Sequence, residues 1–349
     1  MPAVSAPILF SAASDYLSTA FDEVRAAFPD AHTSTVGPDL GSVTADGLSI
    51  ADVAEAARQV PFIFVRHLMR QVGFVPAADM PTADAVADGA AAIWDGLPLP
   101  EAVSLQVWSS GEHAADLRTD DVRKTLEGML KAAGFEVARS GKDHVLSVVL
   151  TAKGAAIGFN TRASALSDWP GGQVRLAKPK GQISRSEFKL EELFREYAID
   201  LPESGRALDL GASPGGWTRI LRQRGLDVWA VDPAELHPSL QADAGVRHVR
   251  STASPFLAKT DLWFDLVVND MRMTPELSSQ MMLDAARTME PGGMIILTLK
   301  LTPAHPAEAV RQSLRLLDRW YEIVLVRQLH HNRHEVTVVG RKRTEHRRG

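Results

Sequence analysis

A Gly-rich turn between two acidic residues is the feature of this sequence that most clearly indicates chemistry. The apolar run that starts at Ala207 ends at Asp209, and a turn from Gly211 to Gly216 follows before a helical pattern begins at Trp217. A second apolar run ends at Asp232. Two parallel strands of this kind form a crevice at their carboxyl ends, and a Gly-rich turn leading into a helix lets the backbone approach a ligand closely. The sequence therefore predicts a nucleotide site.

Two of the three chemistries that fit such a turn are disfavoured by single residues. A dinucleotide-binding turn needs glycine where Ser213 stands, and its pyrophosphate would face the carboxylate of Asp209. The stretch from Gly211 to Gly215 also matches the G-x-S-x-G turn of serine hydrolases. In that turn the residue after the serine supplies a backbone N–H to the oxyanion hole, but Pro214 has no N–H to supply.

S-adenosylmethionine is the third candidate ligand and the one that the sequence favours. Its zwitterionic methionine end and its ribose hydroxyls suit a Gly-rich turn flanked by acids, and Asp232 would accept hydrogen bonds from the ribose. A tight strand–helix turn without a ligand remains the alternative. The pattern indicates methyl transfer without identifying the acceptor.

Four further charged residues stand where elements begin or end. Lys189 lies on a helix before the first of these strands, Asp270 and Lys300 each follow a buried apolar run, and Glu335 starts the last strand. Each of them alone is more often a solvated strand end than a catalyst. Together they offer two amines and two carboxylates for proton transfer and electrostatic catalysis.

The elements that must position these residues follow a strand–helix alternation from about residue 184 onward. The last two strands are too close in sequence for a helix between them, so we expect an antiparallel pair at one edge of the sheet. A seven-stranded α/β sheet with such a pair is typical of class I, Rossmann-like methyltransferases. The expected strands are 206–210, 227–232, 246–250, 264–269, 294–299, 321–327 and 335–339, and the expected helices are 187–197, 275–289 and 306–317.

The first half of the chain has the pattern of smaller α+β units. Apolar runs predict strands at 7–10 and 61–65, with helices at 16–28 and from Ala83 onward. A second unit is expected as a strand at 102–108, a helix at 119–133 and strands at 145–151 and 155–160. A break at Trp169 to Gly172 and a basic linker follow.

Composition limits the classes of protein that this chain can belong to. Of its 349 residues 45% are apolar and 23% are charged, which is usual for a soluble protein, and the lack of cysteine excludes disulfides and thiolate metal sites. We expect no signal peptide or membrane span, and a cytoplasmic setting. The net charge of −5 divides into −9 for residues 1–172 and +4 for residues 173–349. The basic excess of the second half suits contact with phosphates.

Five segments together resemble the FtsJ/RrmJ family of ribose 2′-O-methyltransferases. They are Ser184 to Leu190, Asp209 to Trp217, Val268 to Asp270, Leu299 to Leu301 and His334 to Thr337. The resemblance covers about residues 184 to 341. It implies that the family's K-D-K-E tetrad is Lys189, Asp270, Lys300 and Glu335, and that S-adenosylmethionine is the cofactor. The implied cofactor contacts are Ser186, Asp209, Gly211, Ser213, Pro214, Gly215, Gly216, Trp217, Asp232 and Asp270.

In such a tetrad Lys300 would act as the base, or would orient the ribose hydroxyl, if neighbouring Lys189 lowers its pKa. Asp270 and Glu335 would hold the two lysines, so the site would titrate as a unit. No metal is expected. Three histidines between 330 and 334 are interpreted as solvated or RNA-facing. After the third strand, where the family often has an acid near the adenine, Ser251 and Thr252 offer only hydroxyls.

The front half is similar to a narrower branch, the RlmM-type enzymes, which methylate a cytidine ribose in large-subunit ribosomal RNA. That resemblance implies a ferredoxin-like module at 1–96, a THUMP-like RNA-binding module at 97–175 and the methyltransferase domain at 176–349. RNA is then the expected partner, with neither DNA nor membrane. A catalytically silent RNA-binding or assembly protein and a small-molecule methyltransferase are the alternatives.

Overall fold

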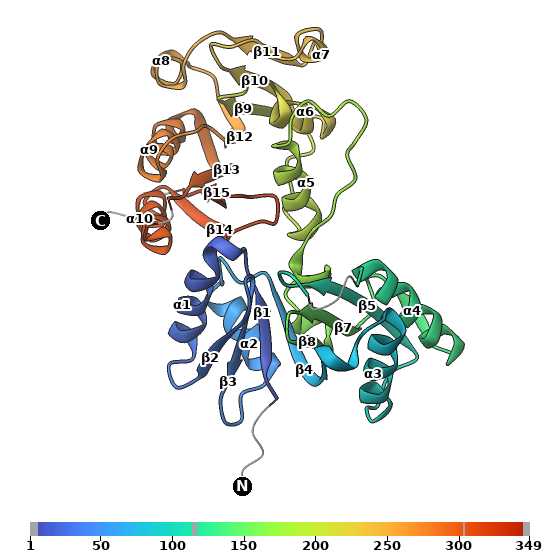
Figure 1. Ribbon diagram of the computed structural model, residues 1–349. Helices are drawn as coiled ribbons and strands as arrows, with labels where there is room; N and C mark the ends of the chain where they lie inside the picture. The colour runs from blue at the N-terminus through green and yellow to red at the C-terminus, as the bar shows by residue number, and fades with distance from the viewer. Residues whose placement is uncertain (1–5, 114–116, 303, 345–349) are drawn as a thin grey trace. The chain divides into compact units, whose positions relative to one another are not determined.

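The computed structural model describes residues 6–113, 117–302 and 304–344. Contacts within the chain divide it into two compact units, residues 1–174 and residues 175–349. Figure 1 shows the helices and strands of each unit. In the described part of the chain, no helix combines the length and the apolar character needed to cross a membrane.

The N-terminal unit is built on one mixed sheet. Its described strands follow the order β2-β3-β1-β4-β8-β7-β5-β6, so β4 pairs with β1 on one side and with β8 on the other. The strands are β1 Ile8–Ser11, β2 His32–Gly37, β3 Leu40–Thr44, β4 His67–Pro76, β5 Ala102–Ser109, β6 Glu136–Ala138, β7 His144–Thr151 and β8 Gly154–Thr161. The α-helices are α1 Leu17–Ala27, α2 Ile50–Gln59, α3 Ala83–Asp95 and α4 Thr119–Ala132.

The order β5–α4–β7–β8 confirms the strand and helix pattern expected in the second part of this unit, with the short strand β6 added. Helices α3 and α4 contribute Trp94 and Leu126 to one apolar core with Leu105 of β5 and Leu146 of β7. The end of β4 enters the same core through Val75. Helix α3, which ends at Asp95, therefore packs in one core with the later strands β5 and β7.

The strand expected at 61–65 is wrong. The backbone amides of Ile63, Phe64 and Val65 donate to the carboxylate of Glu23 at 2.7, 3.0 and 3.3 Å, and the strand begins only at His67. Amides that are bound to a side chain cannot join a sheet ladder, so this apolar run is a buried loop.

The C-terminal unit has a sheet whose seven described strands follow the order β11-β10-β9-β12-β13-β15-β14. Strands β9 to β13 are parallel, whereas β15 is antiparallel to β13 and to β14. The expected antiparallel pair is confirmed. The strands are β9 Arg206–Leu210, β10 Asp227–Val231, β11 Val246–Val249, β12 Phe264–Asn269, β13 Met289–Lys300, β14 Tyr321–Arg327 and β15 Glu335–Lys342. The α-helices are α5 Glu187–Glu196, α6 Gly216–Gln223, α7 Pro238–Gln241, α8 Ala253–Lys259, α9 Pro275–Ala285 and α10 Pro306–Leu317.

Helices cover both faces of this sheet, as Figure 1 shows. Leu190 of α5 and Ile220 of α6 pack on one face, against Ala207 of β9 and Val268 of β12, while α9 packs against β12 and β13 on the other. Strand β9 has β10 on one side and β12 on the other. The strand order thus reverses at β9, and ligands of doubly wound sheets bind at the carboxyl ends of strands beside such a reversal.

Candidate active site

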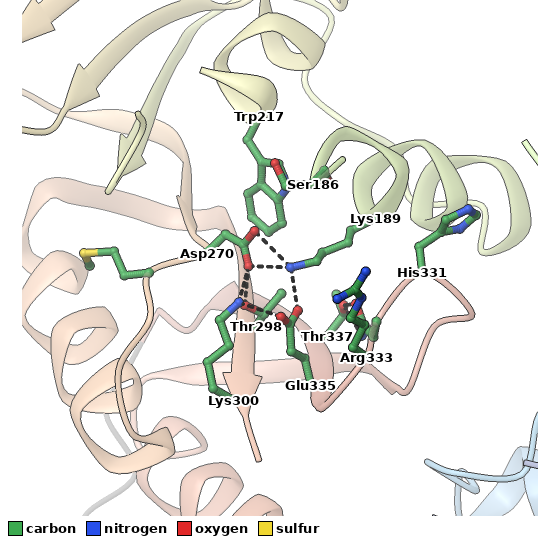
Figure 2. A network of polar contacts seen from close by, with 12 residues as sticks. Ser186, Lys189, Trp217, Asp270, Thr298, Lys300, His331, Arg333, Glu335 and Thr337 are labelled. Atoms are coloured by element: carbon green, nitrogen blue, oxygen red, sulfur yellow. Dashed lines mark hydrogen bonds and ion pairs between the residues drawn. The ribbon is translucent and has the colours of Figure 1, made fainter. Parts of the chain in front are cut away.

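Two lysines and two carboxylates meet beside the carboxyl end of β12 (Figure 2). Lys189 lies in the first turn of α5, Asp270 follows β12 directly, Lys300 is the last residue of β13 and Glu335 is the first residue of β15. Lys300 and Glu335 are register partners across the antiparallel β13–β15 ladder. The structure therefore brings together all four residues that were expected to form the tetrad.

Each lysine contacts both carboxylates, so the four charges form a closed ring. Lys189 Nζ lies 2.9 Å from Asp270 Oδ1 and 2.5 Å from Glu335 Oε2. Lys300 Nζ lies 2.6 Å from Asp270 Oδ1 and 3.0 Å from Glu335 Oε1. The ring is electrically balanced, and its side chains are between 11% and 19% exposed, so a small substrate group can still reach it.

The electrostatics of the ring keep its charges in place. Burial by itself lowers the pKa of Lys189, but the carboxylates of Asp270 and Glu335 outweigh burial and raise it above its ordinary value. Burial also tends to raise the pKa of Asp270, and the two ammonium groups overcome that effect and hold it below its ordinary value. Lys189 and Asp270 are therefore both ionised at neutral pH.

A fifth residue supports the ring and was not predicted from the sequence. The Thr298 hydroxyl donates to Asp270 Oδ1 at 2.6 Å, and this side chain is fully buried. Thr298 stands two residues before Lys300 on β13, and residues two apart on a strand point to the same face. Strand spacing would therefore have identified it once Lys300 was singled out.

A cleft of about 720 Å³ opens at the strand-order reversal, next to the charged ring. Asp270 lines the cleft and also belongs to the ring, so the two sites share a wall. Ser251 and Thr252 also line the cleft. Of the residues expected to contact a cofactor, the cleft is lined by Ser186, Asp209, Gly211, Ser213, Pro214, Gly216, Trp217, Asp232 and Asp270.

Three glycines of the turn serve different purposes. Gly211 has a φ of +73°, and a Cβ there would lie 2.1 Å from Cγ of Met271, a residue that lines the cleft. A Cβ at Gly216 would lie 2.1 Å from Oγ of Ser184. Gly215 does not line the cleft: its φ is +114°, and a Cβ would fall on the buried side chain of Leu240. Its role is to let the chain pass close to that residue.

The two acids of the turn have different environments. Asp209 is buried and accepts a hydrogen bond from the Thr218 hydroxyl at 2.6 Å, and burial raises its pKa to about 7. Asp232 accepts from the backbone amides of Ser213 at 3.1 Å and Ala234 at 2.8 Å. Asp232 thereby fixes the turn, and its oxygens keep lone pairs for further donors.

Buried polar contacts position the segment before α5. Glu187 is fully buried and accepts from the amides of Ile183 at 2.6 Å and Ser184 at 3.1 Å, and from the Arg219 guanidinium at 2.6 Å. The Trp217 indole donates to the carbonyl of Ser186 at 2.9 Å. Trp217 therefore ties this segment to the start of α6 and lines the cleft at the same time. The sequence did not indicate the role of Glu187.

Of the three histidines interpreted as solvated or RNA-facing, His331 is only partly exposed. Its Nδ1 lies 2.6 Å from the buried carboxylate of Glu192, and its ring stacks on Phe188 with a centroid distance of 5.0 Å. His334, by contrast, is exposed. No group of three or more metal-ligating side chains occurs among the residues that the structure describes.

The reversal of strand order, the helices on both faces and the cleft at the carboxyl ends define a Rossmann-like α/β methyltransferase fold. Residues 182–329 match the FtsJ-like methyltransferase family. These residues make up most of the C-terminal unit, which is therefore similar to FtsJ-like methyltransferases. Glu335 lies just beyond the matched residues, and its place in the ring comes from the pairing of β13 with β15.

Proteins called ribosomal RNA large subunit methyltransferase M are similar over a larger part of the chain. The protein from Halorhodospira halophila is 39% identical over 180 residues, which cover 50% of this chain and 51% of that protein. The protein from Alkalilimnicola ehrlichii is 32% identical over 234 residues, covering 62% of each chain. The chain thus spans about half to three-fifths of the length of these relatives. A solved structure of TrmN from Thermus thermophilus aligns with 96% of this chain and 99% of its own, at 16% identity and a TM-score of 0.40, a similarity too low to add to the fold assignment.

Proposed function

We propose that this protein is an S-adenosylmethionine-dependent RNA methyltransferase that modifies a ribose 2′-hydroxyl, on a cytidine of large-subunit ribosomal RNA. The proposal depends above all on Asp270, which lines the cleft and contacts both lysines of the ring. A methyl donor in the cleft and an acceptor hydroxyl at the ring would therefore be neighbours. The similarity to ribosomal RNA large subunit methyltransferase M supports the choice of RNA.

The cleft suits S-adenosylmethionine in size and in chemistry. Its volume of about 720 Å³ is in the range of small-molecule sites. Gly211 and Gly216 line it without a side chain, and a Cβ at either position would press on Met271 or Ser184 in its wall. Asp232 would accept from the ribose hydroxyls, Asp209 offers a carboxylate to the cationic end, and Ser251 and Thr252 offer hydroxyls to the adenine end. When bound there, the cofactor supplies an electrophilic methyl group.

The ring prepares the acceptor hydroxyl for attack. Lys189 is held as a cation by Asp270 and Glu335, and it stabilises negative charge near the acceptor oxygen. Lys300 Nζ, held between Asp270 and Glu335, directs the acceptor hydroxyl for attack. Thr298 and Glu335 keep Asp270 and the lysines in position. Much of the acceleration then comes from holding oxygen and methyl at attack distance.

We propose further that residues 1–96 and 97–175 are the ferredoxin-like and THUMP-like modules that bring RNA to this site, in the cytoplasm. The N-terminal sheet supports a two-part unit, because β1 to β4 and β5 to β8 form its two halves and meet at the β4–β8 pair. The shared core of α3, α4 and Val75 suggests that the second module begins structurally before residue 97.

The function is tested by mapping 2′-O-methyl groups in ribosomal RNA from cells with and without this protein. We expect one large-subunit cytidine to lose its methyl group, and the full-length protein to restore it. Lys300→Ala should bind the same RNA and fail to restore the methyl group. Unchanged methylation in the absence of the protein would contradict the ribosomal assignment. Full activity of Lys300→Ala would contradict the role of the ring.

A further inference from the structure

The loop between β14 and β15, residues 328–334, is unusually well fixed for a surface loop. The carboxylate of Glu192, on α5, accepts hydrogen bonds from the backbone amides of His330 at 2.6 Å and His331 at 2.8 Å. It also contacts Nδ1 of His331 at 2.6 Å. A buried carboxylate is costly unless its lone pairs are satisfied, and Glu192 is only 2% exposed. The loop conformation that satisfies Glu192 is therefore strongly preferred.

Two more contacts fix the second half of the same loop. Asn332 is buried, and its Nδ2 donates to the Thr337 hydroxyl at 2.9 Å. The Gln328 side chain donates to the backbone carbonyl of Arg333 at 3.3 Å. The backbone on both sides of Arg333 is thus held, although the Arg333 side chain is exposed.

Arg333 presents a cation beside the charged ring. It stands two residues before Glu335, and Figure 2 shows its side chain among those that surround the ring. Within the described residues, no hydrogen bond or ion pair joins the Arg333 guanidinium to another side chain. The two lysines of the ring, in contrast, are each paired with two carboxylates and leave no net charge for an RNA phosphate.

We propose that the Arg333 guanidinium binds an RNA phosphate next to the acceptor ribose, and that Glu192 holds the loop in the conformation that makes this contact possible. The inference rests on the proposed function, because it names a phosphate of the RNA substrate as the group that binds beside the ring. A guanidinium matches phosphate oxygens with two parallel hydrogen bonds, and phosphate contacts fix the register of a nucleic acid without reading its sequence. Helix α5 thereby carries Lys189 for the acceptor ribose and Glu192 for the loop that binds its phosphate.

Arg333 is tested in the full-length protein with an unmodified large-subunit ribosomal RNA transcript. Arg333→Gln should weaken RNA binding about tenfold and lower the slope of log affinity against log salt by about 0.7 to 0.9, the value for one lost phosphate contact. S-adenosylmethionine affinity should not change. Arg311→Gln is the matched control, because Arg311 is an exposed arginine of α10 and its loss changes the net charge equally. Equal RNA affinities and salt slopes for the two variants would overturn the proposal.

Glu192 is tested by coupling to Arg333. Glu192→Gln keeps the side-chain size but loses one acceptor, so it should weaken RNA binding in the wild-type background and have little further effect in Arg333→Gln. Additive losses would show that Glu192 does not act through Arg333. Arg333→Lys keeps the positive charge but loses the planar pair of hydrogen bonds. This variant should keep most of the salt dependence of RNA binding while its affinity for RNA falls.

The two proposals can fail separately. If the wild-type protein binds the transcript through Arg333 but transfers no methyl group to it, the phosphate contact stands and the methyltransferase proposal fails. If it methylates the transcript and Arg333→Gln binds as Arg311→Gln does, the methyltransferase proposal stands and the phosphate contact is overturned.

Discussion

Lys300 and Glu335 lie opposite each other across the β13–β15 ladder, with Lys300 Nζ 3.0 Å from Glu335 Oε1. The two residues are 35 positions apart in the sequence, and the antiparallel register alone makes them neighbours. Asp270 reaches the same point from the parallel strand β12. The ring therefore forms where the parallel part of the sheet meets its antiparallel edge. The distances within the ring depend on the register between β13 and β15.

Replacing Thr298 by valine should reduce kcat about tenfold without a large change in KM for RNA. The change keeps the side-chain shape and removes the hydroxyl that donates to Asp270 Oδ1 at 2.6 Å, a bond to a charged group worth about 1.5 to 3 kcal/mol. Steady-state kinetics of methyl transfer measure the effect. Thr288→Val is the control, because its hydroxyl donates to the carbonyl of Ala285, which is not part of the ring. Similar losses of kcat in both variants would point to a general effect of destabilisation.

Asp270→Asn should reduce methyl transfer at least about 100-fold, because both lysines lose a charged partner at the wall of the cleft. The variant should also unfold at a lower temperature at neutral pH. The folded protein holds the pKa of Asp270 below its ordinary value, so the ionised group stabilises the fold above pH of about 4, and this contribution is lost as the pH falls through the folded pKa. Melting temperatures of the two proteins should therefore converge as the pH falls below about 4. A constant difference at all pH values would contradict this linkage.

Asp209→Asn should have the opposite pH signature. Burial raises the pKa of Asp209 to about 7, so ionising it destabilises the fold. The stability of the wild-type protein should fall as the pH rises from about 4, the unfolded pKa, to about 7, by at most about 4 kcal/mol. Asparagine does not titrate and can still accept from the Thr218 hydroxyl, so the variant should lack this slope. Thermal melts of both proteins from about pH 4 to pH 8 test this, and parallel curves would refute the assignment.

Gly211→Ala should weaken S-adenosylmethionine binding more than about tenfold, because its Cβ would lie 2.1 Å from Met271 Cγ and push that side chain at the wall of the cleft. Gly292→Ala provides a matched control. Gly292 has a φ of +84° against +73° for Gly211, so both variants carry a similar backbone strain of about 1 to 2 kcal/mol, but nothing lies within 4 Å of a Cβ at Gly292. Calorimetric titration of the cofactor should separate the two variants. Equal affinities would mean that the cleft does not need Gly211.

The sequence by itself determined the local structure that leads to the cleft. The apolar run ending at Asp209, the Gly-rich turn and the helix that follows depend on short-range periodicity and on the backbone freedom of glycine, which can be recognised without a fold. The resemblance to a family also selected Lys189, Asp270, Lys300 and Glu335 before any distance was known. The strands at 206–210, 264–269 and 321–327 begin and end where the sequence predicts.

Only the tertiary structure decided which side chains share an environment. The apolar run at 61–65 is a loop because Glu23, about 40 residues away, accepts hydrogen bonds from its amides. The loop residue His331 is held because Glu192 of helix α5 contacts it. Gly215 faces Leu240 instead of the cleft. Each outcome depends on contacts between residues far apart in the chain, and local periodicity carries no information about such contacts. The sequence supplies the residue types that the chemistry needs, and the register of the sheet brings those residues together into a site.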